Sequence, residues 1–341
     1  MSVFLDFRSD TRTAPDAAMR AAMAAAEVGD DAYGDDPCVR ELEEEGARLL
    51  GTGAALFLPS STMANLVAVL AATPGPGTRL LMGAQSHIAL FEAEGMRRFA
   101  GADPVALPER DDGAPDPDAL AAALREGGGR PGIVALENTC MMHTGNALDP
   151  AEVDRLAGLG RERGAHIHLD GARLANAAVA LGVPLEKLAA PADSVTFCLA
   201  KGLGAPVGSL LCADAEFVVR ARELRLLLGG TMHQSGVLAA AALEGLARVS
   251  RLAEDHALAA QLAEGLAGVP GAEVGDPPCP TNIVTVRLPG RDPDELRERL
   301  AERGVLVLPL PTGSVRFVVH REHRAEAVPL VVRALAEAAL Q

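Results

Sequence analysis

Four side chains of this sequence could do chemistry and lie where apolar, strand-like runs end. Ser61 and Thr62 follow one such run and open a helical stretch, Asp170 ends a second run, and Lys201 follows a third. Hydroxyls and free N–H groups at a helix start suit a phosphate, although a serine or threonine before a helix more often only caps it. For Asp170, pairing with a protonated ring nitrogen and simple capping are equally good interpretations.

Lys201 is the most specific of the four. It lies between an apolar run and the small residues of Gly-Leu-Gly-Ala-Pro, residues 202–206, which leave room for a planar group. Lysine forms Schiff bases with carbonyl cofactors, so Lys201 is a candidate for this role. The alternative interpretation is that Lys201 is an ordinary solvated lysine at a strand end. Helix-start hydroxyls, an acid and then a lysine, in this order, predict the phosphate anchor, ring-nitrogen partner and Schiff-base lysine of a pyridoxal 5'-phosphate (PLP) site.

The elements that must position these residues alternate between apolar runs and helical stretches. This alternation predicts an α/β fold with a mainly parallel sheet, in which ligands bind outside the carboxyl ends of the strands. The predicted strands are Ala54–Leu58, Arg79–Met82, Gly132–Leu136, Ala165–Leu169, Ser194–Leu199 and a returning strand Gly208–Cys212, with a helix at Pro150–Arg163.

The pattern changes in the last third of the chain. We therefore expect a large cofactor-binding domain over residues 1–245, including an N-terminal arm, and a smaller α+β domain over residues 246–341. The boundary falls in a long helical region, Gly236–Leu266, in which the pattern also indicates a break. In the smaller domain we predict strands at Asn282–Arg287, Val305–Leu308 and Ser314–Val319 and helices at Pro293–Arg303 and Ala325–Leu340.

Composition excludes several classes of protein. Of the 341 residues 49% are hydrophobic, enough for a large core, and the formal net charge is −15 with no basic run. Nucleic acids and anionic membranes need clustered lysine and arginine, so neither is an expected partner. We find no signal peptide and no run near the ~20 apolar residues of a spanning helix. Five scattered cysteines predict neither disulfides nor a metal site, so we expect an acidic, soluble, cytoplasmic protein.

Five segments of the sequence form recognisable motifs: DFRSDTRT (6–13), EVGDDAYGDDP (27–37), PSSTMAN (59–65), HLDGARLANA (168–177) and SVTFCLAKGLGAPVGSLL (194–211). They resemble the motifs of one known family, the low-specificity threonine aldolases. These PLP enzymes have the aspartate-aminotransferase-like fold, which is fold type I. The resemblance covers nearly the whole chain and implies a mainly parallel, seven-stranded sheet flanked by helices, with a smaller α+β C-terminal domain.

The resemblance implies the residues that bind the cofactor. Lys201 is then the lysine that holds PLP, Asp170 is the partner of the pyridine nitrogen, and His87 stacks on the cofactor ring. The phosphate and the remaining cofactor contacts fall to Ser61, Thr62 and Arg173.

The resemblance also implies a substrate site that two subunits share. Ser9, Arg173 and Arg316 lie where family members grip the substrate carboxylate, a task that suits the arginine fork. Tyr33 and the loop Gly229–Gln234 lie where the family completes the site of a neighbouring subunit. We therefore expect a homodimer or homotetramer with shared active sites.

Several positions depart from the family pattern. Cys140 stands where the family usually has a histidine that is proposed to contact the substrate β-hydroxyl. We expect His143 or His87 to assist proton transfer in its place, because an imidazole titrates closer to neutral pH than a thiol. Met141 and Met142 make this wall more apolar and favour substrates with an apolar β-substituent. The other departures are Ser61 for a glycine, Leu226 for a lysine and His233 for an arginine.

The activity implied is cleavage of a β-hydroxy-α-amino acid. L-threonine, L-allo-threonine or a related compound would give glycine and an aldehyde. A PLP-dependent β-eliminating lyase, an amino-acid racemase or a transaldolase could use the same residues and remain the alternatives. A non-catalytic PLP-binding protein is the least supported, because a lysine and carboxylate-binding arginines are both present.

Overall fold

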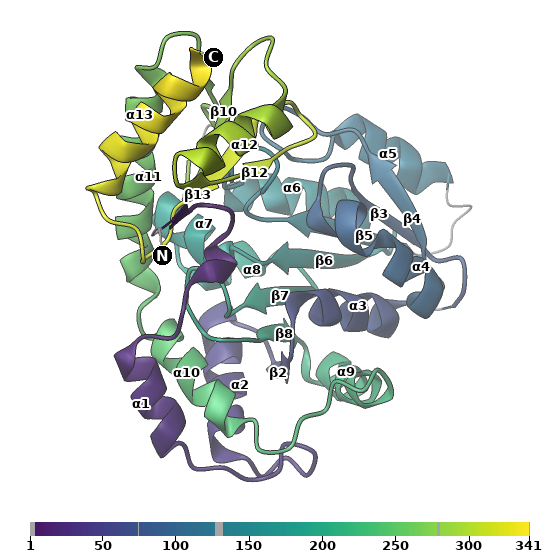
Figure 1. Cartoon of the computed structure of the whole chain (residues 1–341). Coiled ribbons are helices and arrows are strands. Elements are labelled where there is room, and N and C mark those ends of the chain that lie inside the picture. Colours follow the sequence, from purple (N-terminus) through teal and green to yellow (C-terminus); the bar gives the residue numbers. More distant parts are fainter. Residues whose placement is uncertain (1–3, 74, 127–131, 278–279, 341) are drawn as a thin grey trace.

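A seven-stranded sheet forms the centre of the chain (Figure 1). The computed structural model describes residues 4–73, 75–126, 132–277 and 280–340. Every strand of this sheet is parallel to the others except β8, which returns antiparallel between β2 and β7. Across the sheet the strands are β2 Ala54–Leu58, β8 Ser209–Ala213, β7 Ser194–Cys198, β6 His166–Gly171, β5 Ile133–Glu137, β3 Arg79–Gly83 and β4 Asp103–Leu107.

Helices cover both faces of this sheet, because alternate residues of its strands are apolar on each side. In β8, for example, Leu210 and Cys212 enter one core while Leu211 enters another. On the first face lie α2 Pro37–Leu50, α5 Pro117–Glu126, α6 Pro150–Arg161, α7 Leu174–Leu181 and α8 Leu185–Ala189. On the second face lie α3 Ser61–Ala72, the π-helix η2 Ile88–Glu92, α4 Ala93–Ala100 and α9 Ala215–Leu227. The predicted α/β class with a mainly parallel seven-stranded sheet is confirmed.

A second, antiparallel sheet lies above the first in Figure 1 and has a core of its own. The predicted helical region is broken as expected, since α10 ends at Leu246 and a short 3-10 turn precedes α11. The predicted boundary near residue 245 lies at the end of α10 and stays a prediction. The long helical region consists of α10 Gly236–Leu246, which packs in the core of the large sheet, then η3 Val249–Arg251 and α11 Leu252–Ala267. The smaller part also contains α12 Pro293–Glu302 and α13 Ala327–Ala339. The strands of its sheet are, in order, β12 Leu308–Pro309, β13 Val315–Val318, β10 Ile283–Arg287 and β9 Glu273–Val274.

The N-terminal arm joins the two parts of the structure. Its strand β1, Leu5–Asp6, pairs in parallel with β11, Val305–Leu306, beside the smaller sheet. The arm then runs through the 3-10 turn η1, and the hydroxyl of Thr13 donates a 2.8 Å hydrogen bond to the carbonyl of Lys201. The arm is thus fixed against the candidate site. Its remaining elements are η1 Asp10–Arg12 and α1 Ala17–Ala25, the latter packed on α10.

Two local predictions need correction. The strand β4 is absent from the predicted strands. Its sequence Asp-Pro-Val-Ala-Leu contains a proline, which an edge strand tolerates because its outer side needs no ladder hydrogen bond. The single strand predicted at Val305–Leu308 is two short strands, of which β11 pairs with β1 and β12 with β13.

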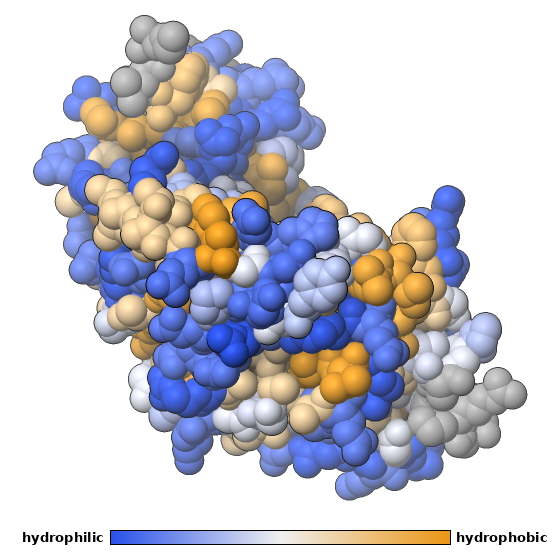
Figure 2. Space-filling view, turned by 90° about the horizontal axis from the view of Figure 1, so that it is seen from below, coloured by the Kyte–Doolittle hydropathy of each residue, from blue (hydrophilic) through white to orange (hydrophobic). Residues whose placement is uncertain are grey.

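No helix within the described ranges has the length and apolar character needed to cross a membrane. The face in Figure 2 is largely hydrophilic, with small, separate hydrophobic areas.

Candidate active site

The predicted cofactor residues meet at one edge of the large sheet. Because β2, β7, β6 and β3 run parallel, their carboxyl ends share this edge, and the antiparallel β8 does not disturb it. Ser61 follows β2, Lys201 follows β7, and His87 follows β3. Asp170 lies in β6 and is paired in register with Thr196 of β7. Topology therefore brings together side chains that the sequence separates by more than a hundred residues.

The start of α3 suits a phosphate. Ser60 caps this helix by accepting a 3.1 Å hydrogen bond from the N–H of Met63, which leaves Ser61 in the first turn. The Ser61 hydroxyl is buried and has no hydrogen-bond partner in the described part of the chain. A buried hydroxyl without a partner costs free energy, and a phosphate at the helix start would satisfy it. The Thr62 hydroxyl points elsewhere and donates to Glu92 over 3.1 Å.

Asp170 is a buried acid at the carboxyl end of its strand. One of its oxygens accepts a 3.0 Å hydrogen bond from Asn65 Nδ2 and the other a 3.0 Å bond from the N–H of Ala172. These two bonds hold the carboxylate in one orientation. The arrangement fits a partner for a protonated pyridine nitrogen.

Lys201 is half-buried at the turn after β7. Its carbonyl accepts hydrogen bonds from Thr13 and, over 2.8 Å, from the N–H of Gly204. Gly204 has a φ of 81°, a left-handed conformation that glycine adopts without strain. The charge of Lys201 acts on both Asp10 and His87, so all three groups lie close together. Its ammonium has no hydrogen bond or ion pair among the residues that the structure describes.

His87 is held at two points. Its backbone N–H donates to the carboxylate of Glu137, and its ring nitrogen Nδ1 lies 2.8 Å from Oε1 of Glu92. Burial alone would lower the pKa of His87, but the Glu92 hydrogen bond and the charge of Asp170 raise it overall. Burial and the Asp170 charge in turn raise the pKa of Glu137 to about 7. The second ring nitrogen, Nε2, has no hydrogen bond within the described ranges.

The two predicted carboxylate-binding arginines differ in their surroundings. Arg173 forms a bidentate ion pair with Asp10, with distances of 2.8 Å from Nε and 2.7 Å from Nη2, and both side chains are buried. Arg316 of β13 is only 5% exposed and forms no ion pair among the described residues. Its Nη2 donates to the carbonyl of Arg8 over 3.3 Å, and its Nε has no partner. Burial and the charge of Arg173 lower the pKa of Arg316 to about 10.

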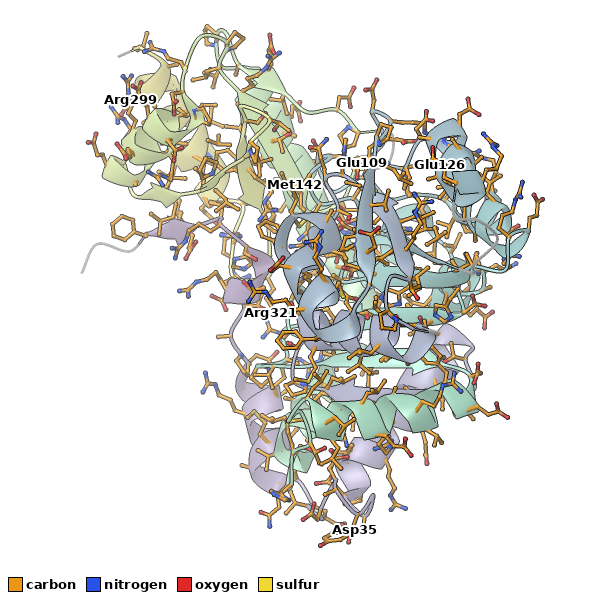
Figure 3. All side chains as sticks on the ribbon, turned by 90° about the vertical axis from the view of Figure 1, so that its right-hand side faces the viewer. Asp35, Glu109, Glu126, Met142, Arg299 and Arg321 are labelled. Carbon is orange, nitrogen blue, oxygen red and sulfur yellow. The ribbon has the colours of Figure 1, made fainter. Side chains whose placement is uncertain are left out.

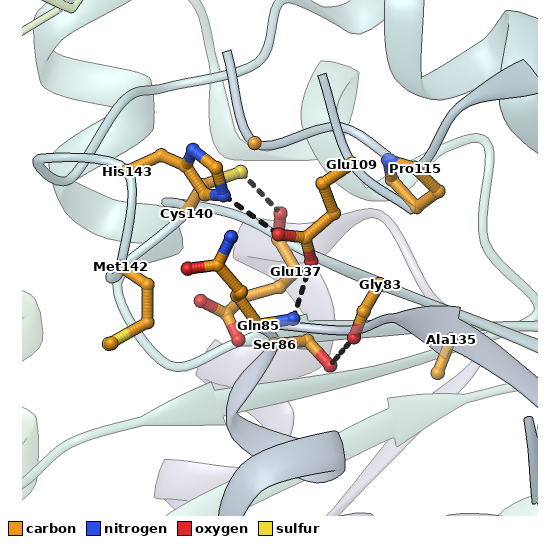
Figure 4. Close-up of a pocket in the computed structure, with 11 residues that line it drawn as sticks. Gly83, Gln85, Ser86, Glu109, Pro115, Ala135, Glu137, Cys140, Met142 and His143 are labelled. Atoms are coloured by element: carbon orange, nitrogen blue, oxygen red, sulfur yellow. Dashed lines mark hydrogen bonds and ion pairs between the residues drawn. The ribbon is translucent and has the colours of Figure 1, made fainter. Parts of the chain in front are cut away.

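Cys140 and His143 line a small cavity beside this edge, with a volume of about 10 Å³, room for roughly one water molecule (Figure 4). His143 Nε2 lies 2.7 Å from Oε2 of Glu109, and this hydrogen bond raises the pKa of His143. The Cys140 thiol faces the carbonyl of Glu137 over 3.5 Å, and burial raises its pKa well above the ordinary value. Among the described residues no cluster of histidine, cysteine, aspartate and glutamate could hold a metal ion.

Tyr33 lies far from these residues. Asp35, two residues further along the chain, lies at one end of the molecule, well away from the centrally placed Met142 (Figure 3). The Tyr33 side chain is 84% exposed, in a turn whose Asp31 N–H donates a 3.0 Å hydrogen bond to the carbonyl of His233. The structure thus brings together the two segments predicted to complete a neighbouring subunit's site, and places them away from the candidate site of their own chain.

Sequence reasoning missed five residues that hold the predicted ones in place. They are acidic or amide side chains whose partners lie far along the chain or, for Glu92 and His87, at a spacing of five that is not α-helical, so no familiar local spacing pointed to them. Asp10 and Asn65 lie in the motifs quoted above, which was the available signal. The five are Asp10, Asn65, Glu92, Glu109 and Glu137.

The fold and this edge of the sheet are those of a fold type I PLP enzyme, and the relatives narrow the class to a lyase. The model of the beta-eliminating lyase family matches residues 6–289. The low-specificity L-threonine aldolase of Escherichia coli strain K12 is 41% identical over 330 residues, which are 94% of this chain and 96% of that protein. Low-specificity L-threonine aldolase 1 of Arabidopsis thaliana is 39% identical over 327 residues, covering 93% and 91%.

The solved structure of Leishmania major threonine aldolase has the same fold, with a TM-score of 0.82 at 22% identity over 97% of this chain and 98% of that one. The chain belongs to the beta-eliminating lyase family and, within it, to the low-specificity L-threonine aldolases. The family recognised from the five motifs is confirmed.

Proposed function

We propose that this protein is a PLP-dependent aldolase that cleaves L-threonine, L-allo-threonine or related β-hydroxy-α-amino acids to glycine and an aldehyde. The names of its relatives support this substrate class. The observation that carries the proposal is Arg316, a buried guanidinium without a carboxylate partner among the described residues. A buried, unpaired cation is costly, and the α-carboxylate of an amino acid would supply the missing anion in the geometry that arginine prefers.

Three residues hold the cofactor in this proposal. Lys201 would bind it covalently, Asp170 would accept a hydrogen bond from its ring N–H, and Ser61 would bind its phosphate at the start of α3. When bound, PLP would supply a protonated pyridine ring that can take up the electron pair of a broken bond at Cα. His87, which follows β3, would stack on this ring.

Substrate orientation falls to the arm and to Arg316. Asp10 holds Arg173 rigidly beside the site, so that Arg173 presents its remaining Nη1 to the ligand. Ser9, one residue before, already accepts hydrogen bonds from the N–H and the hydroxyl of Thr11. Its own proton remains available for the substrate carboxylate.

Proton transfer from the β-hydroxyl is assigned to His87. With Nδ1 engaged by Glu92, its Nε2 can accept a proton. His143 is the second candidate, but Glu109 holds its Nε2 and the Asp111 backbone forms a further hydrogen bond with the ring. Cys140 is disfavoured because burial raises the pKa of its thiol. A base must reach its proton in the ionisation state that can accept it.

The active enzyme is proposed to be a homodimer or homotetramer. Large apolar side chains are exposed near the Tyr33 turn and on α9, and an exposed patch of this kind commonly marks an interface. They include Tyr33, Leu226 and Leu227. Light scattering should therefore give at least a dimer, and a fully active monomer would refute the shared site. The cytoplasmic location stays a prediction.

One experiment tests the cofactor assignment directly, because Lys187 and Lys201 are the two lysines of the chain. The loaded protein is reduced with borohydride, digested and analysed by mass spectrometry. The cofactor mass should appear on the peptide that carries Lys201 and not on the peptide with Lys187. An adduct on Lys187 alone, or an adduct that persists in Lys201→Ala, would overturn the assignment.

A second experiment separates the aldolase from its alternatives. Threonine, allo-threonine and phenylserine are each supplied, and glycine, aldehyde and 2-oxo acid are measured. Equal release of glycine and aldehyde supports the proposal. Release of a 2-oxo acid and ammonia would instead identify a β-eliminating lyase. Inversion at Cα without cleavage, detected as conversion of threonine into its allo diastereomer, would identify a racemase.

A further inference from the structure

Glu92 is a buried carboxylate at the candidate site, 4% exposed, with no lysine or arginine ion pair in the described part of the chain. An ionisable group in such a place needs polar partners. Its partners are the ring nitrogen of His87 at 2.8 Å, the hydroxyl of Thr62 at 3.1 Å and Nδ2 of Asn65 at 3.2 Å. The first two belong to residues predicted to contact the cofactor.

The contact between His87 and Glu92 depends on an unusual helical turn. The two residues are five apart in the chain, and an α-helix of 3.6 residues per turn would point their side chains about 140° apart. Residues Ile88–Glu92 instead form a π-helix. Its hydrogen bonds join residues five apart and bring both side chains to one face. Such turns occur frequently at functional sites.

Asn65 extends the contact to the third cofactor residue. Its Nδ2 donates to Glu92 and also, over 3.0 Å, to Oδ2 of Asp170. Its Oδ1 lies 3.1 Å from Nε2 of His168, and burial lowers the pKa of that histidine to about 4. Because the carboxylate oxygens of Glu92 and Asp170 both accept from the Asn65 NH2 group, the amide oxygen Oδ1 faces Nε2 of His168, where a neutral ring can donate.

We propose that Glu92 is a positioning residue of the PLP site, whose single carboxylate fixes the His87 ring, the Thr62 hydroxyl and, through Asn65, the Asp170 carboxylate. The inference rests on the proposed function, which assigns the His87 ring to the ring face and the Asp170 carboxylate to the ring nitrogen, while Thr62 neighbours the phosphate-binding Ser61. Glu92 acts through these partners. No feature of the local sequence pointed to it, since a spacing of five is not an α-helical spacing.

The test replaces Glu92 with glutamine. Glutamine has one acceptor oxygen and one donor NH2 group where Glu92 has two acceptor oxygens, so at least one of the three hydrogen bonds is lost and the partners are held less firmly. The matched control is Glu94→Gln, because Glu94 lies two residues on and, among the residues that the structure describes, forms ion pairs only with Arg97 and Arg98 on the surface. Both variants are purified as the cofactor-loaded protein.

Two readouts report on how the cofactor is held. Visible circular dichroism measures the asymmetry of the ring's surroundings, and the rate of PLP loss into a trapping solution measures its retention. In Glu92→Gln we expect a clearly weaker dichroic band and PLP loss about tenfold faster, as expected for one lost hydrogen bond to a charged group. Glu94→Gln should match the wild type in both.

The outcomes separate this inference from the function on which it rests. If the wild type shows a Lys201-dependent visible band and releases aldehyde, while Glu92→Gln behaves like Glu94→Gln, the positioning role is wrong and the function stands. If Lys201→Ala keeps the wild-type band, the function itself is wrong. Should Glu92→Gln not fold, Glu92→Asp keeps the charge one methylene further back. A smaller change of the same sign then supports the proposal, and wild-type behaviour overturns it.

Discussion

Replacing Asp10 with asparagine should destabilise the protein strongly, although Asp10 lies in a short N-terminal arm. Asp10 and Arg173 are 0% and 4% exposed at their side chains and form a bidentate pair, and Asn282 Nδ2 also donates to Asp10 over 3.2 Å. The change leaves the Arg173 guanidinium buried without a counter-charge. Breaking one side of a buried pair typically costs about 3–5 kcal/mol, so we expect a loss near 3 kcal/mol with an isosteric amide.

The assay is urea denaturation of the cofactor-free protein, since bound PLP would add its own binding free energy to the folded state. The control is Asp154→Asn, which removes the exposed pair with Arg161, whose side chains are 64% and 47% exposed. An exposed pair contributes about 0–1 kcal/mol. A loss in Asp10→Asn no larger than in the control would refute the reasoning from burial.

The same pair predicts a pH dependence. Burial alone would raise the pKa of Asp10, but the charge and hydrogen bonds of Arg173 lower it overall. A carboxyl whose folded-state pKa is lowered stabilises the fold above its unfolded pKa of about 3.9 and loses that contribution as the pH falls toward the folded value. The difference between wild type and Asp10→Asn should therefore be full at pH 7 and shrink below about pH 4.

Three further predictions concern turnover. Cys140→Ser should keep cleavage within about threefold of wild type while His87→Ala loses most of it, since the base is an imidazole; abolition by Cys140→Ser with both His87→Ala and His143→Ala at wild-type rates would reverse the assignment. Phenylserine should have a higher kcat/KM than threonine because segment 140–142 is apolar, and faster threonine cleavage would contradict this. Arg316→Lys should raise the KM for the amino acid about tenfold, because a guanidinium that can bind a carboxylate through two nitrogens is replaced by a single ammonium group. An unchanged KM would remove Arg316 from the substrate site.

The sequence by itself was enough to predict the fold class, which the structure confirms, and to name candidate residues for the chemistry. The strands around Asp170 and Lys201 are continuous apolar runs, as strands buried on both faces must be, and each ends at a polar side chain that needs an explanation. Local order therefore sufficed to predict a parallel sheet with a lysine and an acid at its carboxyl edge.

Only the tertiary structure decided what each of those side chains touches. Arg173 was predicted as a ligand for a carboxylate, and the fold shows that Asp10, 163 residues away in sequence, already occupies two of its nitrogens. Arg316, by contrast, has no carboxylate partner within the described ranges. The physical reason is that a buried charge is satisfied by whichever group the packing brings within about 3 Å, and strand order sets that neighbourhood, whereas spacing along the chain does not.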